Sequence, residues 1–428
     1  MPTEATIRSK AGTMGRAAEF HRVGSLCALA AGAWLGMAEA PVRMADVSMR
    51  PGTISLRMVA GVFVARWSFP TLIRGTGAVL ADLRARAHLM VWAVLAGALW
   101  AVGNTLTVYA IRDVGLSVAF PLWNANGLIG LFWGVVLFRE LRGASRGTQL
   151  RVVAGAHVIV LAAILLGLSL MRGQTQAQPH LAEGVAAALG AGLMWGTMYV
   201  PYRKAYLSGM NPLSFVTVFT VGELGTMTAL AVMLAGGARP LELELSAHRG
   251  SLFWIFLGGF CWVVGDMFQQ YATKLIGIGR GISLSNTNQL WGMLWGAFAF
   301  GEMAGATAGQ RWMIVGGSVL MVVGTVAISS ASASAGELRQ TEVAMEREAR
   351  LYGLAASSDT KPEANPAKRR QWDWLILVAS GAVFLLLARQ AKPPVGMAAP
   401  GWAIALAAAA CGLMVFAGQR LWRATRFA

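Results

Sequence analysis

The sequence predicts an all-α integral membrane protein with two inverted five-helix repeats, ten transmembrane helices in all, followed by an additional C-terminal pair of transmembrane helices. Three observations lead to this fold class: the composition, an internal repeat and the distribution of positive charge. Of the 428 residues, 56% are hydrophobic and only 13% are charged, and the mean hydropathy is +0.55. That composition leaves too little polar surface for a soluble globular protein of this length.

The internal repeat is clearest where two distant segments share one pattern. Residues 124–140 read NANGLIGLFWGVVLFRE and residues 286–302 read NTNQLWGMLWGAFAFGE, 162 positions later. At that offset, 18 of the 49 positions from Leu95 to Gly143 are identical. Such self-similarity at a fixed distance indicates that one structural unit occurs twice.

A second match sets the boundaries of that unit. Residues 24–45 match residues 184–205 at an offset of 160, so the unit begins with the first apolar segment and contains five helices. This argues against a cleaved secretory signal there, as does Pro41, which would directly follow the cleavage site. We divide the chain into a cytoplasmic N-terminal arm (1–22), the first five-helix repeat (23–171), the second five-helix repeat (181–330), a charged cytoplasmic linker (332–371) and the additional helix pair (372–428).

Each predicted span is long enough to cross a hydrocarbon core, which takes about 20 helical residues. The second span is the least regular, because Arg57 and Arg66 interrupt it and each charge near the bilayer centre costs about 2.5 to 3.5 kcal/mol. In the linker, ELRQTEVAMEREARL predicts a short charged helix. The expected spans are 23–42, 54–73, 88–111, 115–138, 150–171, 181–202, 212–236, 251–273, 281–300 and 311–330 in the repeats, and 372–389 and 398–418 in the C-terminal pair.

The distribution of positive charge orients these spans. An odd number of crossings places two copies of a unit in opposite orientations across the membrane. With the N-terminus inside, the cytoplasmic segments carry 25 Lys and Arg residues, against about 9 outside, as the positive-inside rule requires. We therefore expect a multi-pass protein of the cell's inner (plasma) membrane with its N-terminus, its C-terminus and its linker in the cytoplasm.

Composition and motifs exclude several classes of function. The net charge of +16 is explained by topology and by contact with anionic membrane lipid, so we expect no nucleic-acid partner. The three cysteines lie in apolar segments without paired spacing, and the five histidines form no ligand pattern, so we expect no metal site. A GxSxG match at residues 143–147 lies in a basic loop without the strand-to-helix turn that a nucleophile needs. We expect neither an enzyme nor a cofactor.

The repeated motifs are similar to those of a known family. Two copies of Asn-x-Asn, each followed by a helix with Gly-x-x-Trp-Gly and a final Glu, occur together with AGLMWGTMYVPYRKA at 191–205. These residues resemble the drug/metabolite transporter superfamily and, within it, the glucose/ribose porter branch, which includes bacterial glucose uptake permeases and the animal transmembrane protein 144. The resemblance covers about 23–330. It implies ten helices, a central cavity between the halves, and uptake of a sugar or related polyol with a proton or sodium ion.

Candidate substrate-binding residues follow from helical spacing, since positions three, four and seven apart share a face. Asn126 and Trp133 on the fourth helix correspond to Asn288 and Trp295 on the ninth. An amide beside an aromatic ring suits a sugar, because it can bond hydroxyl groups while the ring covers the apolar face. Packing is the alternative, because the neighbouring Gly-x-x-x-Gly spacings let helices approach closely.

The sixth and eighth helices supply further candidates. Trp195 and Tyr199 are expected to line the cavity, whereas Tyr202 is better explained as an anchor at the membrane surface. On the eighth helix, Gln270 is a candidate substrate ligand and shares a face with Asp266.

Two carboxylates are candidates for ion coupling, because charge within apolar helices is expensive and therefore suggests a function. They are Asp266, whose counterpart in the first copy is the neutral Asn104, and Glu39. Pairing with Arg57 or Arg66 is the alternative explanation. Glu223 is a further intramembrane carboxylate, and Glu140, beside a loop, is expected to be structural.

Two inverted repeats without a large soluble domain are typical of a secondary transporter. We expect a secondary active transporter that moves a small polar metabolite, in particular a monosaccharide or polyol, by alternating access. An exporter of a metabolite or drug-like amphiphile on the same fold is one alternative, and a non-transporting membrane scaffold or sensor is another. The expected partners are a small-molecule substrate and membrane lipid, with a homodimer left open.

Overall fold

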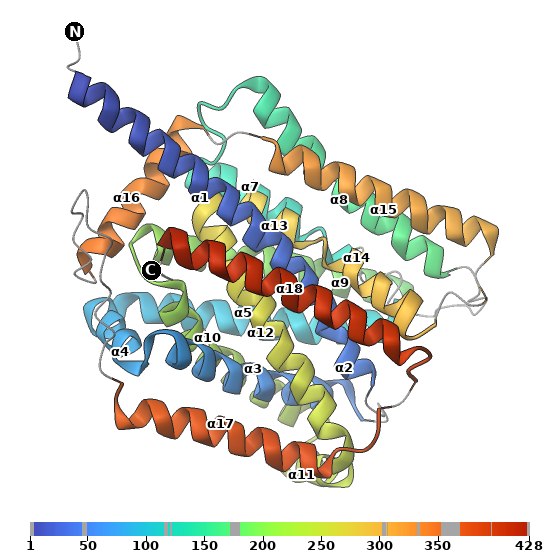
Figure 1. Cartoon of the computed structure of the whole chain (residues 1–428). Coiled ribbons are helices and arrows are strands. Elements are labelled where there is room, and N and C mark those ends of the chain that lie inside the picture. The colour runs from blue at the N-terminus through green and yellow to red at the C-terminus, as the bar shows by residue number, and fades with distance from the viewer. Residues whose placement is uncertain are drawn as a thin grey trace.

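The computed structural model describes residues 4–44, 49–114, 119, 122–171, 180–301, 305, 307–331, 334–351, 369–394 and 396–425. All secondary structure in these residues is helical (Figure 1). Nine of the described helices are long and apolar enough to cross a membrane, so the chain is a multi-pass all-α membrane protein. These spans are Ala18–Arg43, Pro51–Arg74, Ala87–Ala110, Arg146–Leu166, Pro212–Ala235, Arg249–Ile276, Ala308–Ser329, Gln371–Gln390 and Pro400–Thr425.

The helices follow the predicted order closely, and the predicted short helix of the linker is confirmed as α16. The elements are α1 (Glu4–Met37), α2 (Glu39–Arg43), α3 (Pro51–Arg74), α4 (Thr76–Ala85), α5 (Ala87–Val114), α7 (Asn126–Phe138), α8 (Arg146–Met171), α9 (Leu181–Leu207), α10 (Pro212–Ala235), α11 (Ala238–Ala247), the 3-10 turn η1 (Arg249–Ser251), α12 (Leu252–Ile276), α13 (Ile278–Ser285), α14 (Asn288–Leu294), the π-helical turn η2 (Trp295–Ala299), α15 (Ala308–Ser329), α16 (Ala335–Leu351), α17 (Gln371–Gln390) and α18 (Pro400–Thr425).

Three of the twelve expected spans are not among these nine. The sixth is the long helix α9, which carries Arg203 and Lys204 near its end. The expectation of continuous helices over 115–138 and 281–300 is wrong: α7 begins only after a turn at Asn124, and a turn at Asn286 separates α13 from α14. Both breaks fall at the repeated Asn-x-Asn motif. The side chain of Asn286 compensates for the interruption by donating to the backbone carbonyl of Asn124 at 3.0 Å.

The long helices pack in reciprocal pairs. Helix α5 packs against α9 and α10, while α12, its repeat counterpart, packs against α1 and α3. Glycines make both sets of crossings close. A Cβ atom on Gly97 or Gly222 would collide with backbone of the facing helix at the α5–α10 crossing, and one on Gly61 or Gly259 would do so at the α3–α12 crossing. Such small residues let membrane helices approach until their backbones touch.

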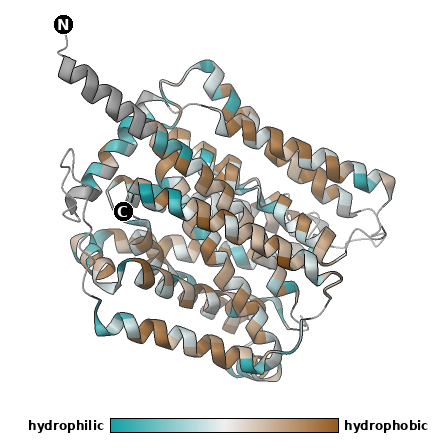
Figure 2. Cartoon of the chain, viewed as in Figure 1, coloured by the Kyte–Doolittle hydropathy of each residue, from teal (hydrophilic) through white to brown (hydrophobic). Residues whose placement is uncertain are grey.

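The remaining helices surround this central group. Helices α8 and α15 pack on each other along one side of the molecule (Figure 1). Helices α17 and α18 do not pair with each other: α17 packs against α3, and α18 packs against α1. Figure 2 shows hydrophobic residues along the length of these outer helices. Their exposed side chains, such as Trp312 on α15, Val378 on α17 and Ile404 on α18, suit contact with lipid tails.

Candidate functional site

Three charged side chains from three different helices meet in the interior. Arg66 of α3 lies between two carboxylates, with Nη1 3.0 Å from Oε2 of Glu223 on α10 and Nη2 2.6 Å from Oδ2 of Asp266 on α12. All three side chains are 0% exposed. We call them the buried ion network. Because desolvating charges is expensive, removing Arg66 from this group would leave its carboxylates without a counter-charge and would be strongly destabilising.

Aromatic rings enclose the guanidinium of Arg66. Its central carbon lies 4.1 Å from the ring centroid of Phe219 and 5.3 Å from that of Trp262. Trp262 in turn makes an edge contact with Trp100, its counterpart in the repeat, at 5.1 Å. The rings stabilise the cation through their negative faces while they exclude water and lipid.

Neutral polar side chains extend the network from α12 to α9. Nε2 of Gln270 donates to Oδ1 of Asp266 at 2.7 Å, and the hydroxyl of Tyr206 donates to Oε1 of Gln270 at 2.6 Å. Two turns earlier on α9, the hydroxyl of Tyr199 donates to Oε1 of Gln269 at 2.6 Å. The α9–α12 interface therefore holds three predicted site residues together: Asp266, Gln270 and Tyr199.

Tyr202 is buried within the protein and is not exposed to a membrane surface. Its side chain is 0% exposed, and its ring packs against Phe215 at 4.9 Å and Phe219 at 5.5 Å. Its hydroxyl oxygen is buried without a hydrogen-bond partner among the described residues. The prediction of an interfacial anchor was wrong because the sequence does not show that α10 presents two phenylalanines to this face of α9.

The two helix breaks meet through the predicted asparagines. Nδ2 of Asn286 donates to Oδ1 of Asn126 at 2.9 Å as well as to the carbonyl of Asn124, and Nδ2 of Asn124 donates to Oε1 of Gln289 at 3.0 Å. The amide of Asn126 is therefore used in joining the halves. Asn288 differs, because its Oδ1 is buried and has no hydrogen-bond partner in the described part of the chain.

The predicted tryptophans lie in different surroundings. Nε1 of Trp133 donates to Oγ1 of Thr197 at 3.1 Å, and Nε1 of Trp195 donates to the carbonyl of Trp100 at 3.4 Å. Trp195 thus contacts Trp100, whose ring packs against Trp262 beside the buried ion network. Nε1 of Trp295 is buried without a partner among the described residues. Glu39 begins α2, and its side chain lies outside the part that the structure describes.

A second cluster of charges lies at the end of the bundle where α16 packs. The Glu140 carboxylate accepts from the backbone N–H groups of Ile278 at 2.8 Å and Gly279 at 3.0 Å, which caps the start of α13. Burial raises the pKa of Glu140, against the lowering effect of Arg203 and of these N–H groups. Anions at a helix N-terminus are favoured by its unpaired donors, so the structure places Glu140 in a capping role.

The same cluster ties α16 to the bundle. Oε1 of Glu337 lies 2.7 Å from Nη1 of Arg280 on α13, and Glu337 also accepts from the backbone N–H of Leu141 at 3.2 Å and of Ser334 at 2.7 Å. Burial alone raises the pKa of Glu337, but Arg280 and these N–H donors outweigh it and hold the pKa below its usual range.

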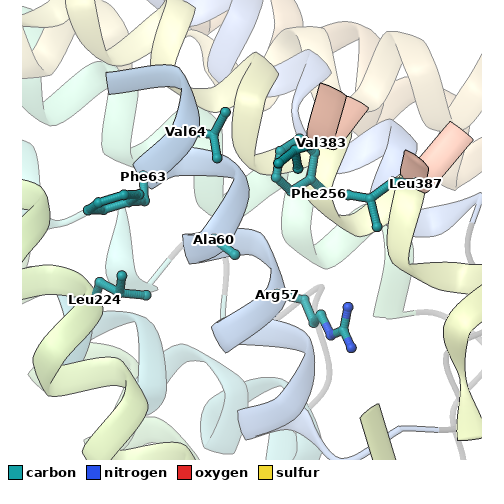
Figure 3. Close-up of a pocket in the computed structure, with 8 residues that line it drawn as sticks. All are labelled: Arg57, Ala60, Phe63, Val64, Leu224, Phe256, Val383 and Leu387. Carbon is teal, nitrogen blue, oxygen red and sulfur yellow. The ribbon is translucent and has the colours of Figure 1, made fainter. Parts of the chain in front are cut away.

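An apolar pocket opens between α3, α10, α12 and α17 (Figure 3). Its volume is about 250 Å³, and it is lined by Arg57 and seven apolar side chains: Ala60, Phe63, Val64, Leu224, Phe256, Val383 and Leu387. A hydroxyl-rich ligand needs several polar partners to replace its water. The chemistry of this pocket therefore suits an apolar chain with an anionic head better than a sugar.

Comparison with known proteins identifies the family. A family model described as sugar transport protein matches residues 77–331, more than half of the chain. The chain belongs to the sugar transport protein family. The match begins within α4, so it includes Glu223 and Asp266 but not Arg66. Membership confirms the resemblance inferred from the repeated motifs and shows a transporter rather than an enzyme.

Two relatives agree with this assignment, and one solved structure shares the fold. A protein of Listeria innocua named for sugar uptake is 25% identical over 241 residues, covering 55% of this chain and 77% of the relative. The glucose uptake protein GlcU of Staphylococcus xylosus is 22% identical over 214 residues, covering 50% of this chain and 69% of the relative. One crystal structure shares the fold with a TM-score of 0.50 at 15% identity, over 72% of this chain and 95% of the other.

Proposed function

We propose that this protein is a secondary active transporter that carries a monosaccharide or polyol across the membrane by alternating access between two inverted five-helix repeats. The observation that carries the proposal is the meeting of the two helix breaks, where Asn286 of one repeat bonds Asn124 and Asn126 of the other. In transporters built from inverted repeats, interrupted helices mark the substrate site near the membrane midplane. Membership of the sugar transport family and the names of the relatives support a sugar as the substrate class.

The reciprocal packing supports the inverted arrangement. If the repeats are related by a pseudo-twofold axis, the contacts of α5 with α9 and α10 must recur as contacts of α12 with α1 and α3, and they do. The glycines at the crossings recur as well, since Gly97 and Gly259 are 162 positions apart. Exchange of conformation between such halves converts outward-open into inward-open access.

The substrate site is proposed to lie beside the helix breaks at Asn124 and Asn286 and the tryptophans near them. Unpaired polar atoms and rings are both present there: Oδ1 of Asn288 and Nε1 of Trp295 are buried without partners among the described residues. A sugar would satisfy such groups with its hydroxyls and place its apolar face on a ring. The proposed ligands are Asn126, Trp133, Trp195, Tyr199, Gln270, Asn288 and Trp295. Proton or sodium coupling is proposed to use the buried ion network, which contains Asp266, one of the two coupling candidates from the sequence. The other candidate, Glu39, is not part of this network.

The test is counterflow of radiolabelled sugars and polyols in proteoliposomes, with and without Asn288→Ala. Wild type should exchange at least one sugar, and Asn288→Ala should weaken binding about tenfold or more, since it removes a polar partner of the ligand, while leaving the yield of folded protein unchanged. Trp312→Phe is the matched control, because Trp312 is 75% exposed on α15. Absence of counterflow for every sugar and polyol tested would contradict the proposal.

Export of an amphiphile is the second candidate, and the apolar pocket with Arg57 is the observation that favours it. An anionic amphiphile could place its head at Arg57 and its chain along the apolar lining. Exchange assays with each class of ligand distinguish the two functions. If such an amphiphile, and no sugar, is exchanged, and Arg57→Gln reduces that exchange, the exporter replaces the sugar carrier.

A further inference from the structure

The buried ion network contains two carboxylates and one guanidinium. If Glu223 and Asp266 were both ionised, the network would hold a net negative charge with all three side chains 0% exposed. An uncompensated charge away from water costs far more than a neutral polar group does. The composition of the network therefore favours one proton shared among its groups, and the hydrogen bonds indicate where that proton resides.

The two carboxylates are bonded differently. Asp266 uses both oxygens, because Oδ2 pairs with Arg66 at 2.6 Å and Oδ1 accepts from Gln270 at 2.7 Å. Glu223 uses only Oε2, which accepts from Arg66 at 3.0 Å. Its Oε1 is buried without a hydrogen-bond partner among the described residues. Burial without partners disfavours the charged form of a carboxyl group, whereas each bond from a donor favours it.

No other ionisable group in the described part supplies the missing partner. Arg66 on α3 pairs with Glu223 and links it to Asp266 on α12. On α9, the ring of Tyr202 packs against Phe219 of α10, and the hydroxyl of Tyr199 donates to Gln269. Helix α5 passes Glu223 at Gly97, in a stretch VLAGALWA without ionisable residues. Helices α4 and α11 adjoin the two ends of α10.

The repeat argues that Glu223 is not needed for packing. Gly222 occupies the α5–α10 crossing as Gly61 occupies the α3–α12 crossing, so Glu223 corresponds to Val62, which is 0% exposed. By the same register Arg66 corresponds to Met227. An apolar side chain thus fills the equivalent position in the other half of the bundle, and the charge in one half is a candidate for function.

We propose that Glu223 carries the coupled proton and that Asp266 is the permanent counter-ion of Arg66. This rests on the proposed transport function and names the ion and its site. A proton binds Oε1 of Glu223 on one side of the membrane, which makes the network neutral. The same proton leaves on the other side, and the carboxylate that remains stays paired with Arg66 through Oε2. One proton enters and one leaves per cycle, while Asp266 keeps its bonds to Arg66 and Gln270.

The experiment compares exchange with accumulation in proteoliposomes that contain wild type, Glu223→Gln, Asp266→Asn or Glu242→Gln. Glu223→Gln should exchange labelled sugar at a rate within about twofold of wild type and independent of pH, because a permanently neutral group cannot gate exchange by titration. Its accumulation driven by a pH gradient should fall at least tenfold, to equilibration. Asp266→Asn should lose exchange as well, since Arg66 then lacks its bonded counter-ion. Glu242→Gln, the same change on the exposed face of α11, should behave as wild type.

Glu223→Asp keeps a titratable group on a shorter side chain. It therefore tests the proposal even if Glu223→Gln fails to fold. It should retain pH-driven accumulation, with a shifted pH optimum. Wild-type accumulation by Glu223→Gln, or an unshifted optimum in Glu223→Asp, overturns the assignment. Wild-type accumulation driven by sodium and insensitive to a pH gradient overturns it too. Failure of wild type to exchange any sugar or polyol is a different result, because it removes the proposed function itself.

Discussion

At the residue scale, the polar side chains of this membrane protein fall into two groups with different surroundings. Those of the buried ion network are fully buried, beside aromatic rings and the neutral amide of Gln270. Those at the α16 end, such as Glu140 and Glu337, bond backbone N–H groups and arginines between elements. The first group suits a change of charge within the membrane, and the second suits fixed connections between helices.

Glu337 gives this difference a measurable form. Its pKa in the folded protein lies below its usual value near 4.5, so its contribution to stability is present above that value and is lost as the pH falls through the folded pKa. Glu337→Gln should therefore reduce the loss of stability on acidification below about pH 4.5, and should lower the melting temperature at neutral pH. Melting curves in detergent at a series of pH values measure both effects.

Glu342→Gln is the matched control on the same helix and should leave the pH dependence of the melting temperature unchanged. An acid transition that is identical in Glu337→Gln and wild type would show that the Glu337–Arg280 pair does not contribute to stability.

At the element scale, most helices could be predicted from the sequence, because long apolar runs and a repeat at a fixed offset both report on length and order. The breaks at Asn124 and Asn286 could not, since hydropathy is the same for a continuous helix and for two short ones. The repeated Asn-x-Asn was recognised, and about 160 degrees between its asparagines on a regular helix was the available sign that the backbone departs from regularity.

The glycine crossings make a prediction about helix packing. Gly259→Ala should destabilise the protein by about 1 to 3 kcal/mol, because its methyl group would collide with the backbone carbonyl of Met58 and separate α12 from α3. Gly316→Ala on α15 has nothing within 4 Å of the added Cβ and should change stability little. The melting temperatures of the two variants, measured side by side, give the comparison. Equal values would mean that the close crossing is not required.

At the scale of the whole molecule, helix packing is reciprocal between the two segments that the sequence match relates. Each half leaves α5 or α12 to be covered by helices of the other half, so neither half can bury its own central helix alone. The sequence revealed the copies but not which helices of one copy face which helices of the other, because offset matching carries no spatial information. For the same reason, Arg66 was foreseen only as one alternative partner of the intramembrane carboxylates, and no prediction placed Asp266 and Glu223 on the same arginine.

The orientation of the whole chain remains a prediction from charge. Both termini and the linker around α16 are expected in the cytoplasm, where loops rich in Lys and Arg are retained. Alkaline phosphatase fused after Leu351 should be inactive in bacterial cells, because the enzyme folds only after export, while a fusion in α11 at Ser246 should be active. The reverse pattern of activity would contradict the predicted membrane orientation.

The uneven count of charges in the buried ion network has an electrical consequence. With a proton on Glu223 the network is neutral, and without it the network carries one net negative charge. Voltage acts only on the charged form, at about 2.3 kcal/mol per elementary charge across 100 mV. In the proposed cycle, a membrane that is negative inside would therefore leave the loaded, inward step unaffected and would favour the return of the empty network toward the outside. The resting potential of the cell would then speed the half of the proposed cycle in which no sugar is carried.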